Sequence, residues 1–136
     1  ADIGLAGRWH ACEYWSGRYL GETGEAIPLP ARQPHGCALV RLTEVAGGPR
    51  LIGSSVNLSQ GAAELTGASR DDGALVLELS SPVECEAVVT VSLPGAGGAA
   101  ASLRKGGRVD VERLAAGVYR ARFALDGGDG LRFEYA

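Results

Sequence analysis

The C-terminal stretch LRFEYA, residues 131–136, decides the fold class because its apolar side chains recur at every second position. In an extended strand, Leu131, Phe133 and Tyr135 face one side of the sheet, and the charged residues between them face the other. This alternation is typical of a β-strand with one buried face.

The same period of two recurs along the chain from Arg8 onward, in runs that are often bounded by Gly, Pro or Asp. Five further runs predict strands: 36–45, 49–60, 73–81, 86–93 and 117–125. We therefore predict an all-β fold, an antiparallel β-sandwich of about eight to ten short strands. The 136 residues fit one such domain, residues 1–136.

Glycine-rich stretches between these runs predict the turns. Residues 67–73 and 126–130 tolerate positive φ, so each is predicted to join two strands. Residues 95–102 predict a flexible loop. Residues 110–117 have less than two turns of apolar helical face, so we predict a strand followed by a turn rather than a helix.

Composition bears on partners and compartment. The net charge is -3 with a single lysine, and the arginines are mostly scattered, so we expect no nucleic-acid partner. The longest uncharged stretch, residues 87–103, is broken by Pro and Gly and is shorter than the roughly 20 residues of a membrane helix, so we expect no membrane partner. Without a signal peptide or any methionine, the chain is expected to be a fragment or a processed product.

The three cysteines, Cys12, Cys37 and Cys85, form no CxxC pair that could begin a zinc site. We predict that all three are small buried hydrophobic residues, with one disulfide pair as the alternative. The sequence does not determine the compartment, although it favours the cytoplasm. There the cysteines would stay reduced.

Residues for catalysis are sparse. His10 lies in an alternating run and His35 in a turn, and both are expected to be structural, with backbone partners. The DGGDG stretch offers two carboxylates, fewer than the six to eight oxygen ligands of calcium. The glycine-rich runs match no nucleotide-binding loop. We therefore expect no catalytic residue, no metal and no cofactor in this chain.

Aromatic residues gather near the N-terminus: HACEYWSGRYLG, residues 10–21, holds three of the eight, and a fourth precedes it directly. Such rings stack on sugars or anchor protein interfaces, and plain core packing is a third possibility. If residues 9–15 are extended, both tryptophans share one face of the strand. The candidate site residues are Trp9, Tyr14, Trp15 and Tyr19.

Several short motifs follow one another in a distinctive order. They are YWSGRYLGE (14–22), IPLPARQPHGCALVRLTEV (27–45), PRLIGSSVNLSQGAAEL (49–65), GALVLELSSP (73–82) and VVTVSLPG (88–95). They contain the patterns W-S-x-x-Y-L-G, P-H-x-x-x-L-x-R-L, P-x-L-I-G-S and L-x-x-G. In this order the chain resembles, over about residues 9–95, the C-terminal β-sandwich domain of alpha-galactosidase-like glycoside hydrolases.

The resemblance implies a noncatalytic accessory domain that packs against a (β/α)8 catalytic barrel. The catalytic aspartates would lie in that barrel, outside this chain, and the parent enzyme would act on alpha-linked sugars. Asn57 stands where family members often have histidine before the leucine, so no role is transferred to that position.

The aromatic stretch would then be a docking surface for the barrel. A carbohydrate-binding module that stacks sugars on these rings is the first alternative, and an adhesion or assembly sandwich that uses its edge strands is the second.

Overall fold

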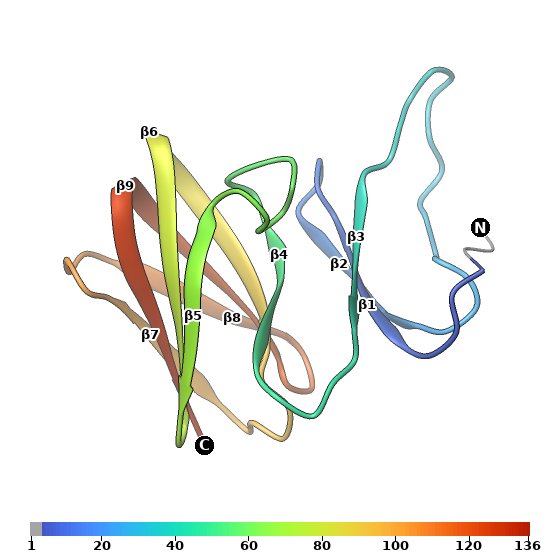
Figure 1. Ribbon diagram of the computed structural model, residues 1–136. Coiled ribbons are helices and arrows are strands. Elements are labelled where there is room, and N and C mark those ends of the chain that lie inside the picture. Colours follow the sequence, from blue (N-terminus) through green and yellow to red (C-terminus); the bar gives the residue numbers. More distant parts are fainter. Residues whose placement is uncertain (1–3) are drawn as a thin grey trace.

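The computed structural model describes residues 4–136, and these form an all-β antiparallel fold without a helix. The prediction of an all-β antiparallel fold is confirmed, and the nine strands fall within the predicted number (Figure 1). They are β1 (Trp9–Glu13), β2 (Arg18–Thr23), β3 (Val40–Glu44), β4 (Arg50–Ser54), β5 (Leu65–Asp71), β6 (Ala74–Ser92), β7 (Ala99–Leu103), β8 (Val109–Ala115) and β9 (Val118–Tyr135).

Two strands are much longer than predicted. The runs 73–81 and 86–93 belong to one strand, β6, of 19 residues, and the runs 117–125 and 131–136 belong to β9, of 18 residues. The two strands pair with each other along almost their whole length. Figure 1 shows that both bend back at the top of the view.

The predicted turn at 126–130 is therefore wrong, because these residues stay inside β9. Gly127 pairs with Ser81 and Gly130 pairs with Glu78, and the register shifts only between Ser81 and Cys85 of β6. Extra residues on one strand bend the ladder locally, and glycines on the other strand accept the bend. Residues 126–130 have the composition of a hairpin turn, but here they allow β6 and β9 to bend together while they remain paired.

The bend divides the six-stranded sheet into two layers. Layer A contains β5, residues 74–81 of β6, residues 127–135 of β9, and β7. Layer B contains β4, residues 85–92 of β6, residues 118–125 of β9, and β8. The two layers form a sandwich in which β6 and β9 contribute to both.

Alternating side chains of both layers fill one hydrophobic core. From layer A it takes Leu75, Leu77, Leu131 and Phe133, all almost fully buried, and layer B contributes Val89, Val91, Tyr119, Ala121 and Phe123. Arg132 and Glu134 lie on the outer face of layer A and pair with each other at 3.1 Å. The inward and outward sides predicted from LRFEYA are thus confirmed.

Several other predicted turns and strands have different bounds in the structure. In the predicted turn 67–73, only Asp72 and Gly73 form the turn, and the residues before them belong to β5. The predicted loop 95–102 contains most of β7, whose alanines pair with β9. The strand-then-turn prediction for 110–117 is confirmed by β8 and the short turn that follows it.

The predicted strands 36–45 and 49–60 are shorter in the structure, as β3 and β4. After Ser54 the chain turns through residues 55–64 before it enters β5.

The first three strands form a separate sheet, in the order β2-β1-β3. This sheet lies against the outer face of layer B, beside β4 (Figure 1). Cys12 of β1, Ile52 of β4 and Val118 of β9 form a second, small apolar cluster at the contact. The aromatic stretch is therefore attached to the sandwich through its own packed interface.

Candidate functional site

The residues that join β1 to β2 form a tight loop, residues 13–17, which we call the aromatic turn. Its first residue is Glu13, the last residue of β1, which is 1% exposed. One carboxylate oxygen accepts hydrogen bonds from the backbone N–H (2.8 Å) and the hydroxyl (2.6 Å) of Ser16. The other oxygen accepts from the backbone N–H of Trp15 at 3.2 Å and lies 3.6 Å from the guanidinium of Arg32. One buried side chain thus fixes the turn.

The surroundings of Glu13 set its charge. Burial raises the pKa of a carboxyl group, but here the hydrogen bonds from Ser16 and Trp15 and the charge of Arg32 outweigh it. The pKa of Glu13 therefore lies below its ordinary value, and the carboxylate is ionised at neutral pH.

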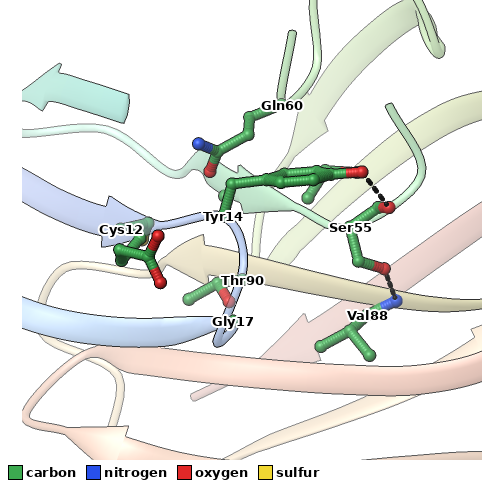
Figure 2. A pocket seen from close by; sticks show the side chains of 10 residues that line it. Cys12, Tyr14, Gly17, Ser55, Gln60, Val88 and Thr90 are labelled. Carbon is green, nitrogen blue, oxygen red and sulfur yellow. Dashed lines mark hydrogen bonds between the residues drawn. The ribbon is translucent and has the colours of Figure 1, made fainter. Parts of the chain in front are cut away.

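Two further contacts tie the aromatic turn to the sandwich. The hydroxyl of Tyr14 donates to the carbonyl oxygen of Ser55 at 3.3 Å, as the dashed line in Figure 2 shows. Arg120 of β9 donates to the carbonyl oxygen of Gly17, which adopts a positive φ of 66°. The turn is therefore held at its start, its middle and its end.

Trp15 stands out from this fixed turn. Its ring meets the ring of Tyr14 edge to face, with the centroids 5.1 Å apart and the planes at 79°. Its side chain remains 56% exposed, although Tyr14 is half-buried. The aromatic turn thus presents one large apolar ring to the surroundings on a rigid base.

The space beneath Tyr14 is small. Figure 2 shows Tyr14 and Gln60 above it, with Thr90 and Val88 on the opposite side. The cavity measures about 20 Å³, which is enough for a single water molecule and far too little for a sugar ring. A sugar bound at the aromatic turn would therefore have to lie on the exposed face of Trp15.

The thiol of Cys12 lies in the wall of the same cavity. A side-chain carbon at Gly53 would come within 3.0 Å of its sulfur, so the thiol is closely packed against β4. Burial raises the pKa of Cys12 to about 12, which keeps the thiol protonated and unreactive. Cys12 is a packing residue.

The other two candidate aromatic residues lie apart from Trp15. Trp9 is half-buried and donates from Nε1 to the carbonyl oxygen of Ala6 at 3.0 Å. Trp9 and Trp15 were expected to share a strand face if residues 9–15 were extended. Strand β1 ends at Glu13, so Trp15 lies beyond it and the two tryptophans share no strand face.

Tyr19 of β2 lies 3.0 Å from Nδ1 of His10, through its hydroxyl. Burial raises the pKa of Tyr19 to about 12 and lowers the pKa of His10. The expected backbone partner of His10 is therefore replaced by a side chain. The structure joins Tyr14 to Trp15 and separates Trp9 and Tyr19 from them.

The cysteine prediction holds in part. Cys12 is buried, as predicted, and Cys85 is partly buried. Cys37 is exposed in the long segment between β2 and β3, so its predicted burial is wrong, and no disulfide joins the three. The residue that sequence reasoning missed is Glu13, whose only signal was a carboxylate three positions before a serine.

The chain was compared with protein families, with curated proteins and with solved structures, and no match was found. Within residues 4–136, no three His, Cys, Asp or Glu side chains are grouped to hold a metal ion. No helix of the same residues has the length and apolar character to cross a membrane.

Proposed function

We propose that this chain is a noncatalytic accessory domain that docks on a partner domain through the aromatic turn. The observation that carries the proposal is the exposed ring of Trp15 on a turn fixed by the buried carboxylate of Glu13. Aromatic anchors of this kind dominate the binding energy of protein interfaces.

Rigidity is what makes this ring suited to docking. A partner that covers Trp15 removes a large apolar surface from water and orders no further backbone, because the hydrogen bonds of Glu13 already fix the turn. A preorganised surface loses less conformational entropy on binding. The aromatic turn therefore offers a favourable anchor at low cost.

The proposed partner is the (β/α)8 catalytic barrel of an alpha-galactosidase-like glycoside hydrolase, which would act on alpha-linked sugars. This identity rests on the motif resemblance alone. The W-S-x-x-Y-L-G pattern begins at Trp15 itself, so the motif and the exposed ring coincide in the chain. The catalytic residues would then belong to the barrel.

A carbohydrate-binding module is the second candidate, because an exposed indole could also stack on a sugar. Titration with galactose and galacto-oligosaccharides separates the two. Trp15 and Trp9 both fluoresce, so a Trp9→Phe variant makes Trp15 the only reporter. We expect no saturable fluorescence change. Trp15→Ala lacks this reporter and is therefore titrated by calorimetry beside the wild type. Saturable binding that disappears in Trp15→Ala by calorimetry would contradict docking and favour the binding module.

A further inference from the structure

A second cavity differs from the one beneath Tyr14 in its size and in the charge of the residues that line it. It opens where the two layers of the sandwich part, between the edge strands β4 and β5, and β3 flanks it. Its volume is about 240 Å³. Nothing in the proposed docking function uses this cavity.

Three arginines line it: Arg41 of β3, Arg50 of β4 and Arg70 of β5. No carboxylate lines the cavity, and none of the three forms an ion pair within residues 4–136. Asp71, next to Arg70 in the chain, lies 3.8 Å from Arg132 instead. In a protein with a net charge of -3, three positive charges thus meet without a counter-charge in the cavity.

The arginines are only partly satisfied by the protein. The Nε of Arg50 is shielded from solvent and has no hydrogen-bond acceptor, and its Nη1 reaches only the carbonyl oxygen of Glu44, at 3.4 Å. An unpaired buried donor is costly, so such atoms in native proteins call for an explanation. The other N–H groups of Arg50 make only that one long hydrogen bond with the described residues, so a bound anion would give them acceptors.

Arg41 and Arg70 hold different positions around the cavity. Arg41 is anchored by bonds to the carbonyl oxygens of Gln60 and Leu51 and by Nε to the hydroxyl of Thr43. Burial lowers the pKa of Arg41, and the charge of Glu64, which lies outside the cavity lining, offsets this in part. Arg70 lies near Gly48, in the connection between β3 and β4, so its side chain reaches across from β5.

Apart from the three arginines and Thr43, the residues that line the cavity are apolar. Leu51, Leu75 and Leu77 belong to the core and are almost fully buried, so they offer little surface to a ligand. The accessible apolar lining is formed by Pro49, Leu65 and Ala68, which are partly or fully exposed. The cavity therefore combines a positive side with a hydrocarbon side that is continuous with the core of the sandwich. Sites that hold small molecules combine apolar walls with a few polar groups in this way.

We propose that this cavity binds a small amphipathic organic anion. Its acidic headgroup lies among Arg41, Arg50 and Arg70, and its hydrocarbon chain lies against the more exposed apolar lining residues Pro49, Leu65 and Ala68. Planar guanidinium groups bind carboxylates through paired hydrogen bonds, which makes a carboxylate the best-fitting headgroup.

The test is a titration of the full chain with octanoate, followed by calorimetry and by amide NMR shifts of Leu65 and Ala68, which line the cavity. Acetate supplies the headgroup alone and octanamide supplies the chain without the charge. We expect saturable binding of octanoate, and binding at least about tenfold weaker for both other probes, because each lacks one half of the interaction.

Arg70→Gln is the decisive variant, because Arg70 is exposed and makes no hydrogen bond or ion pair with the described residues that its loss would break. We expect it to weaken octanoate binding by about tenfold, the effect of one charge-assisted contact. Arg50→Gln should do the same. Arg113→Gln on β8 is the matched control, because this exposed arginine does not line the cavity, and it should bind octanoate as the wild type does.

Three results would overturn the proposal. They are no saturable octanoate binding, acetate binding as tightly as octanoate, and equal octanoate affinity in wild type and Arg70→Gln. Circular dichroism confirms that each variant is folded before it is titrated.

Discussion

Glu13 shows how much one buried residue can determine in this protein. It lies at the last position of β1, where its carboxylate accepts hydrogen bonds from Trp15 and Ser16 of the following turn. The same side chain ends the strand and places the exposed ring. Sequence reasoning identified Trp15 and Tyr14 as candidates, but it could not identify Glu13, because the burial of a carboxylate depends on the tertiary fold around it.

Replacement of Glu13 by glutamine should destabilise the fold. An amide of the same shape can accept with only one end, so part of the hydrogen bonding within the aromatic turn is lost. We expect a loss of roughly 1–3 kcal/mol in the free energy of unfolding at neutral pH, measured by urea denaturation. Glu84→Gln is the control, because Glu84 is exposed and has no ion pair with the described residues, and it should change the stability little. Equal stability of Glu13→Gln and wild type would contradict the role given to Glu13.

The difference in stability between wild type and Glu13→Gln should depend on pH. The pKa of Glu13 in the folded state lies below the ordinary value of 4.5, so the unfolded chain binds the proton first. The contribution of Glu13 is therefore fully present above pH 4.5 and is lost as the pH falls through its folded-state pKa. Urea denaturation across this range should show the difference between wild type and Glu13→Gln shrink in acid. A constant difference would speak against an ionised Glu13.

His10 should titrate below the ordinary value of 6.5, because burial lowers its pKa. As the pH falls from 6.5 toward the folded-state pKa, the unfolded chain gains the proton first, so the stability declines over that interval. An NMR titration of the ring protons, assigned by their absence in His10→Gln, measures the pKa directly. A midpoint at or above 6.5 would be inconsistent with the burial of the ring.

At the scale of elements, the sequence predicted which side chains face the core but not where strands end. The alternation in 73–81, 86–93, 117–125 and 131–136 correctly predicts strand structure, and LRFEYA correctly predicts its inward side chains. The DGGDG stretch has the composition of a hairpin turn, yet it remains paired with β6. Composition reports which backbone angles a segment tolerates, whereas the neighbouring strand decides whether the segment turns.

Gly117, in the turn between β8 and β9, provides a test at this scale. It adopts a positive φ of 67°, and a side-chain carbon there would lie 2.9 Å from the carbonyl oxygen of Leu93. Gly106 also has a positive φ, but nothing lies within 4 Å of the added carbon. Gly106→Ala should cost about 1–2 kcal/mol from backbone strain alone, and Gly117→Ala should cost clearly more. Urea denaturation of the two variants measures the difference, and equal losses would show that the close approach to Leu93 is unimportant.

At the scale of the whole molecule, the sequence predicted a sandwich, and the structure adds a separate three-stranded sheet on its outer face. The aromatic stretch was recognised as a candidate site from its composition. Its division into an exposed pair, Tyr14 and Trp15, and two separate residues depends on where β1 ends, which no local pattern indicated. The arginine-lined cavity was also beyond sequence reasoning, because its three arginines come from three different strands.

The central claim, that the aromatic turn anchors this domain to a partner, is tested most directly by the stability of Trp15→Ala in two contexts. In the isolated chain, where the ring is 56% exposed, we expect urea unfolding to change by about 0.5 kcal/mol or less. In the proposed longer parent protein, the same substitution should cost roughly 2–4 kcal/mol, as for a buried aromatic anchor. Val83→Ala, at an exposed position on the bend of β6, should be neutral in both. An equally small effect of Trp15→Ala in both contexts would contradict the claim.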